Sequence, residues 1–134
     1  MHLRALLVCE DVRIEVDGTL TLIGVRNDRL RVRATRAPIA LDHLSFLLVV
    51  GGLTGVERIG FRERIRHLHD VRPDAQPLRH ERHDPTTDEH NFVFGHSPMV
   101  FPELGSFEVI VDLETPTESA TYRHRFGVES AVET

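Results

Sequence analysis

The sequence lacks several residue types, and each absence removes a class of structure. Its 134 residues include a single cysteine, Cys9, so no disulfide can form within the chain. A reducing cytoplasm is therefore the simplest expected location. No lysine occurs, so all 16 basic residues are arginines, as a GC-rich genome favours. The longest apolar run, Phe46 to Val50, is far shorter than the roughly 18 residues that a membrane-spanning helix needs.

The first twelve residues also lack the features of a secretory signal. They contain one arginine and a short apolar stretch that runs directly into Glu10 and Asp11, without a small-residue cleavage site. The net charge of −5 argues against a general nucleic-acid binder, because such domains are usually basic. We therefore expect a cytoplasmic protein that binds neither membranes nor nucleic acids.

What is present is the composition of an ordinary globular domain, with 40% hydrophobic and 28% charged residues. The length predicts one domain, residues 1–134, that buries roughly 65–70% of its unfolded surface. No window of the sequence shows helical periodicity, and no repeat of about 20–50 residues is visible. These features leave an all-β fold as the simplest expectation.

Short apolar–polar alternations separated by turn residues indicate strands along most of the chain. Residues 12–16 alternate and lead into Asp17-Gly18 and then residues 19–23, which predicts a hairpin with a type I′ turn. The apolar run Leu44–Val50 predicts a central strand. Two alternating segments between residues 107 and 128 predict a closing hairpin.

Together these segments predict an all-β antiparallel β-sandwich of immunoglobulin-like architecture with about 7–9 strands. A small barrel is the alternative. Residues 70–90 contain three prolines and almost no apolar residues, so they predict a long irregular segment with one short strand near residues 78–83.

Four stretches of the sequence resemble a family of small uncharacterised bacterial all-β proteins. They are LVCEDVRIEVDGTLTLIGV (residues 7–25), LDHLSFLLVV (41–50), FPELGSFEVIVDL (101–113) and RHRFGV (123–128). The resemblance implies a β-sandwich and a bacterial, cytoplasmic protein. It implies no activity, because the family is a domain of unknown function.

Histidines concentrate in the middle of the chain, where six of the nine lie within residues 67–96. His67 and His69 are two apart on a predicted strand, so both imidazoles would share one face and could bind zinc or another divalent transition-metal ion. The side chains that could complete such a site are His80, His83, Asp74 and Glu81.

The position of Asp74, five residues after His69, is also near the spacing of a cupin metalloenzyme. The glycines that surround the cupin motif are absent, however. The alternative interpretation is that these histidines lie on a solvated strand end and loop without binding any metal.

Arginines occur at a period of two in a second candidate site. Arg29, Arg31 and Arg33 would line one face of a strand and could bind phosphate, a carboxylate-rich partner or RNA. Residues 62, 64 and 66 repeat this arginine pattern. The repetition favours the alternative that both stripes are solvent faces whose charges hinder edge-to-edge aggregation.

No sequence motif indicates catalysis. Cys9 lies in an apolar run that is typical of an inert core thiol, and neither a nucleophile elbow nor a phosphate-binding loop is present. We predict a binding or assembly module that contacts a protein partner or a second copy through its sheet edges and the 70–90 segment. The alternative is a metal-dependent protein centred on His67 and His69.

Overall fold

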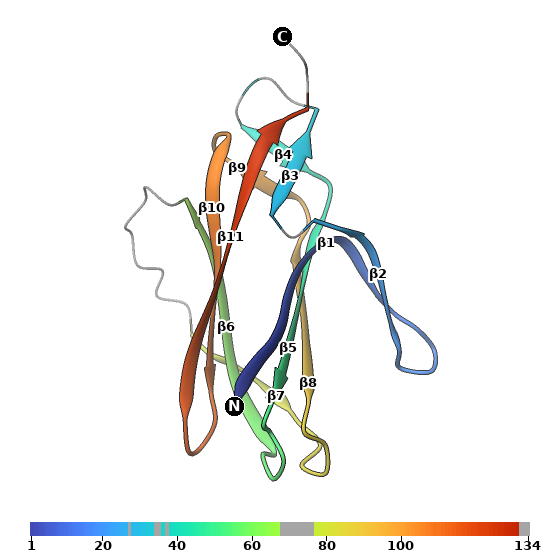
Figure 1. The fold of residues 1–134 in the computed structure, drawn as a ribbon, viewed down its shortest axis with the longest axis vertical. Helices are drawn as coiled ribbons and strands as arrows, with labels where there is room; N and C mark the ends of the chain where they lie inside the picture. Colours follow the sequence, from blue (N-terminus) through green and yellow to red (C-terminus); the bar gives the residue numbers. More distant parts are fainter. Residues whose placement is uncertain (27, 34–35, 37, 68–76, 132–134) are drawn as a thin grey trace.

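The computed structural model describes residues 1–26, 28–33, 36, 38–67 and 77–131, and these residues form an all-β protein (Figure 1). Its strands are β1 (His2–Ile14), β2 (Leu20–Val25), β3 (Arg29–Val32), β4 (Ile39–Leu41), β5 (Leu44–Gly51), β6 (Arg58–His67), β7 (Arg79–Arg82), β8 (His90–His96), β9 (Met99–Phe101), β10 (Gly105–Glu114) and β11 (Ser119–Ser130). In this part of the chain we find no helix that is long and apolar enough to cross a membrane.

The strands form three sheets. One has four strands in the order β2-β1-β5-β8, the second has five in the order β3-β11-β10-β6-β7, and β4 pairs with β9. The β11–β3 pair is parallel, which is an exception to the predicted antiparallel arrangement. The other strand pairs of the described residues are antiparallel, including the closing hairpin of β10 and β11.

A single hydrophobic core joins the two larger sheets. Phe46 of β5 stacks on Phe94 of β8 at 5.1 Å and also meets Phe126 of β11, with ring centroids 6.3 Å apart. Phe61 of β6 stacks on Phe92 at 5.0 Å. Burying each phenyl ring contributes about 1.5–3 kcal/mol, so contacts across the sheets hold the two layers together.

The hairpin between β1 and β2 forms where the sequence predicted it, and in Figure 1 its tip extends away from the rest of the sheet. The predicted type I′ turn is wrong, because it needs a positive φ at both central residues. Gly18 has a φ of 85°, but Asp17 does not have a positive φ, and neither does any other described non-glycine residue. The Gly18 N–H donates to the Glu15 carbonyl at 2.9 Å, which closes a three-residue loop. The Asp17 carboxylate accepts hydrogen bonds from the backbone and hydroxyl of Thr19 and stabilises this alternative turn.

The described residues contain more strands than the 7–9 predicted, because β3, β4, β7 and β9 are only three or four residues long. Strands this short contain few alternations, so the sequence pattern indicates them only weakly. In the predicted irregular segment 70–90, residues 70–76 lie outside the described residues. The strand β7 occupies the place of the predicted short strand, and residues 83–89 form a compact loop.

Candidate functional sites: an arginine face and a histidine pair

The outward side of the five-stranded sheet carries a cluster of arginines, which we call the arginine face. Phe61 of β6 and Phe126 of β11 point into the core, so the residues next to them in each strand point outward. We define the arginine face by seven of the arginines on this side, which are Arg29 and Arg31 of β3, Arg62, Arg64 and Arg66 of β6, and Arg123 and Arg125 of β11. Arg58 and Arg82 lie on the same side, nearer the β7 edge of the sheet.

Glu108 of β10 lies buried among these arginines, with a side chain that is 4% exposed. Its Oε1 accepts hydrogen bonds from Arg66 Nε at 3.2 Å and from Arg123 Nη1 at 3.1 Å, and Arg125 Nε lies 3.5 Å from its Oε2. Burial alone would raise the pKa of Glu108, but the hydrogen bonds and charges of Arg123 and Arg66 outweigh burial and lower it. The carboxylate therefore fixes three guanidinium groups.

Asp112, four residues further along β10, has a similar role. Its Oδ2 accepts a hydrogen bond from Arg62 Nε at 3.0 Å and forms an ion pair with Arg62 Nη2, also at 3.0 Å. Its Oδ1 accepts a hydrogen bond from the Thr121 hydroxyl at 2.7 Å. Burial would raise the pKa of Asp112, but these hydrogen bonds and the charges of Arg62 and Arg64 lower it. Two carboxylates thus order the centre of the arginine face.

Between the two carboxylates lies Ile110, which points outward and is nevertheless completely buried. It pairs across the strands with Arg64 and Arg123, whose aliphatic stems cover it. The Nε of Arg64 is buried and has no hydrogen-bond partner within the described residues. The face therefore contains an unmatched donor, which is rare for a buried polar group.

The predicted stripe of Arg29, Arg31 and Arg33 lies at the edge of this face. Arg29 and Arg31 belong to β3 and lie 3.8 Å and 3.7 Å from the Glu129 carboxylate, whereas Arg33 is exposed just beyond the end of the strand. The ion pairs of Arg29 and Arg31 with Glu129 are both largely exposed to solvent. The structure thus joins this stripe to the one on β6 through β10 and β11.

Sequence reasoning missed Arg123 and Arg125 as members of the same surface. The signal was present, since both alternate with inward residues in the predicted last strand. What the sequence could not supply was the strand order, which places β11 between β3 and β10.

His67 faces the core side of β6, like Phe61. Its ring meets Phe107 edge-on with centroids 5.0 Å apart, and its Nε2 lies 3.3 Å from Glu103 Oε1. It pairs with Phe107 near one end of β6, whereas His80 of β7 pairs with Gly60 near the other. Seven residues separate these positions along β6, a distance of roughly 20 Å.

The structure therefore does not bring His67 together with His80. His83 lies beyond His80, where its backbone N–H donates to the Glu57 carbonyl. His69 and Asp74 lie outside the described residues, and within the described ranges no group of three metal-binding side chains converges.

A different histidine pair does come together. His83, directly after β7, and His90, the first residue of β8, approach with their Nδ1 atoms 3.0 Å apart. His83 Nε2 lies 3.0 Å from the Thr87 carbonyl oxygen, and His90 Nε2 lies 2.8 Å from Glu81 Oε2. Sequence reasoning named His83 and Glu81 as candidates but did not predict that His90 would meet them, because the contact depends on the path of the loop.

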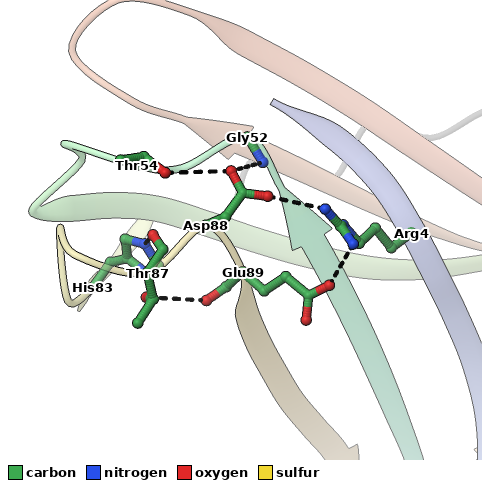
Figure 2. A network of polar contacts seen from close by, with 7 residues as sticks. All are labelled: Arg4, Gly52, Thr54, His83, Thr87, Asp88 and Glu89. Carbon is green, nitrogen blue, oxygen red and sulfur yellow. Dashed lines mark hydrogen bonds and ion pairs between the residues drawn. The ribbon is translucent and has the colours of Figure 1, made fainter.

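That loop is held by a polar network centred on Asp88 (Figure 2). Asp88 Oδ1 accepts hydrogen bonds from the Gly52 N–H at 3.1 Å and the Thr54 hydroxyl at 3.4 Å, and Oδ2 accepts one from Arg4 at 3.0 Å. The Gly52 hydrogen bond is the main cause that lowers the pKa of Asp88. Arg4 also pairs with Glu89 at 2.7 Å, so the loop is anchored to β1 and to the β5–β6 turn.

Two arrangements resemble parts of catalytic sites but differ from them in burial or geometry. Cys9 is completely buried, and burial raises the pKa of its thiol, so the reactive thiolate is disfavoured. His43 lies near Ser45 and Asp11, but both contact the same ring nitrogen, Nε2, at 2.5 Å and 3.6 Å. A catalytic triad needs opposite nitrogens for the acid and the nucleophile.

Comparisons with known proteins add no family. Neither a protein-family model nor a curated protein sequence matches the chain. The resemblance to a bacterial family of small all-β proteins therefore stays a prediction.

Proposed function

We propose that this chain is a cytoplasmic binding module, with the architecture of an immunoglobulin-like β-sandwich, that binds an acidic segment of a protein partner on its arginine face. The observation that carries this proposal is the placement of seven of the 16 arginines on one sheet face of a chain whose net charge is −5.

The face holds more positive than negative charge. Seven guanidinium groups of the arginine face stand against four carboxylates on the outward side of the same strands. These carboxylates are Glu108, Asp112, Glu114 and Glu129. Arg123 is half exposed and Arg125 is 75% exposed, so their remaining N–H donors face solvent. Exposed guanidinium groups with free donors form strong, charge-assisted hydrogen bonds to carboxylates.

The arginines are also ordered before any partner arrives. Glu108 and Asp112 hold four of them in place through hydrogen bonds and ion pairs. Ordering a long side chain costs about 0.5–1.5 kcal/mol on binding, and this cost is smaller for a side chain that is already held. The two carboxylates therefore support binding although they reduce the net charge of the face.

A protein partner is favoured over a nucleic acid by the charge of the whole chain. The phosphate backbone of DNA or RNA is attracted over long distances by net positive charge, and this chain is net negative. An acidic peptide needs only the local field of the arginine face, which acts within the Debye length of about 8–10 Å.

The test is fluorescence anisotropy with a labelled peptide of alternating aspartate, glutamate and small residues. We expect saturable binding that weakens as salt increases. Arg123→Gln with Arg125→Gln should weaken it at least tenfold, because these two arginines are the most accessible in the centre of the face. The matched control is Arg13→Gln with Arg26→Gln, which removes two exposed arginines from the β1–β2 region and should leave affinity within about twofold.

Equal losses in both double variants would contradict the proposal, because they would show an effect of net charge alone. Tighter binding of a single-stranded RNA of equal charge would contradict the choice of partner. Sedimentation of the wild type and the Arg123→Gln, Arg125→Gln variant shows whether the acidic partner is a second copy, since only that dimer would dissociate in the variant.

A further inference from the structure

The close pair of His83 and His90 presents a problem of proton placement. The Nε2 of His83 faces a backbone carbonyl, and the Nε2 of His90 faces the Glu81 carboxylate. A carbonyl and an ionised carboxylate can only accept hydrogen bonds, so both Nε2 atoms carry the proton. A neutral imidazole has only one N–H, which leaves a lone pair on each Nδ1.

These two lone pairs face one another across 3.0 Å. Two acceptors at this distance repel unless an electron-poor atom lies between them. The atom can be a shared additional proton or a metal ion that accepts both lone pairs.

The surroundings of the pair are those of metal-binding histidines. Such histidines commonly donate the other ring N–H to a carboxylate or a backbone carbonyl, which fixes the ring and its tautomer. Glu81 and the Thr87 carbonyl supply one of each. The Asp88 network in Figure 2 anchors the loop that carries Thr87, so this outer partner is held in place.

The separation of the two nitrogens also indicates a coordination geometry. An ion about 2.0–2.1 Å from each Nδ1 would subtend an angle of roughly 95° across the 3.0 Å separation. This angle is close to the right angle of square-planar or octahedral coordination, which Cu²⁺ and Ni²⁺ adopt, and smaller than the tetrahedral angle of structural zinc sites.

We propose that His83 Nδ1 and His90 Nδ1 together bind one divalent transition-metal ion, with Cu²⁺ as the preferred ion. Glu81 and the Thr87 carbonyl are positioning groups and not ligands. No third histidine, cysteine or carboxylate joins the pair in the described ranges, so water completes the coordination. A surface hollow lined by Glu57, His80 and Arg82 borders His83 and gives the ion access.

The site links the two main sheets. His83 follows β7, at the edge of the five-stranded sheet, and His90 begins β8, at the edge of the four-stranded sheet. A bound ion would therefore clamp the crossing between the sheets and stabilise the folded chain by mass action.

The experiment is electron paramagnetic resonance of the full chain with one equivalent of Cu²⁺. The amino terminus and His2 offer a competing copper site, so every variant carries His2→Ala as background. We expect one bound ion with splitting from two ring nitrogens, and a higher unfolding temperature with copper than without it. His90→Phe should remove both, and the similar size of phenylalanine preserves the contact with Phe92, whose centroid is 4.5 Å away.

Two further variants separate ligation from structure. Glu81→Gln keeps both ligands and should weaken copper binding by about 10-fold to 100-fold without changing the number of nitrogens. His80→Phe removes an exposed histidine beside the site and should change nothing. A copper spectrum that is unaltered in His90→Phe, or no binding by the His2→Ala chain at one equivalent, would overturn the proposal and leave a shared proton between the rings.

Discussion

The outward sides of the two main sheets both shield buried residues from water, one with apolar side chains and the other with arginines. Each sheet has a central strand, β5 or β10, in which some outward residues are buried as well as the inward ones. Leu47 on β5 is 5% exposed and pairs with the apolar side chains of Leu7 and Val93. Ile110 on β10 is completely buried and pairs with Arg64 and Arg123.

The comparison teaches that burial of a sheet face and the chemistry it presents to solvent are separate properties. Aliphatic stems of arginine exclude water from Ile110 as completely as apolar neighbours exclude it from Leu47, and they still place charged groups at the surface. One outward face is therefore apolar and half-buried, while the other is ionic and ordered.

The largest expected effect on stability comes from truncating the buried outward residue of each central strand. Leu47→Ala and Ile110→Ala should each lower the free energy of unfolding by about 3 kcal/mol, because each removes a buried side chain and leaves a cavity. Urea denaturation measures both. The control is Val16→Ala in the exposed hairpin loop, which should stay within about 0.5 kcal/mol. A cost below about 1 kcal/mol for Ile110→Ala alone would show that arginine stems do not seal the sheet.

Replacing Glu108, the buried carboxylate of the arginine face, should have a smaller effect on stability. Glu108→Gln should lower the free energy of unfolding at pH 7 by about 2 kcal/mol, since hydrogen bonds to a charged group typically contribute 1.5–3 kcal/mol. Three guanidinium groups would then lose their shared anion.

The difference in unfolding free energy between wild type and Glu108→Gln should depend on pH in a defined direction. The pKa of Glu108 is lower in the folded chain than its value of about 4.3 in an unfolded chain. Its contribution is therefore fully present above about pH 5 and is lost as the pH falls through the folded pKa. Urea denaturation between pH 3 and pH 7 should show the difference between wild type and Glu108→Gln shrinking as the pH falls below about 5, and a difference that grows towards low pH would contradict this assignment.

The smallest effect is expected at the edge of the same face. Glu129→Gln should change the free energy of unfolding by less than about 0.5 kcal/mol, because its pairs with Arg29 and Arg31 are long and open to solvent. The same denaturation series measures it. A cost equal to that of Glu108→Gln would mean that burial does not distinguish the carboxylates of the arginine face.

The sequence predicts those parts of the molecule that depend on local patterning. A continuous apolar run correctly marks the central strand around Leu47, and alternation correctly marks the β1–β2 hairpin and the closing hairpin. It also places Arg29 and Arg31 opposite buried Leu30. The predicted type I′ turn at Asp17 is wrong, because the hydrogen bond that Thr19 donates to the Asp17 carboxylate favours a different turn geometry.

Features that depend on strand order were not predictable. The arginine face requires that β11 lie between β3 and β10, and nothing in a single sequence fixes that neighbour relation. The meeting of His83 with His90 depends on a loop held by Asp88, Gly52 and Arg4, which are up to 84 residues apart in the chain. Long-range contacts of this kind have no local signal.

The parallel pairing of β3 with β11 has a consequence for synthesis of the chain on the ribosome. Arg29 to Val32 pair with Gly127 to Ser130, so β3 is made early and remains without its neighbour until almost one hundred further residues have been translated. A strand in that condition exposes unpaired backbone groups, which is a hazard for association with other nascent chains. The like charges of Arg29 and Arg31 repel an identical strand during this interval, so they protect the chain before the fold exists.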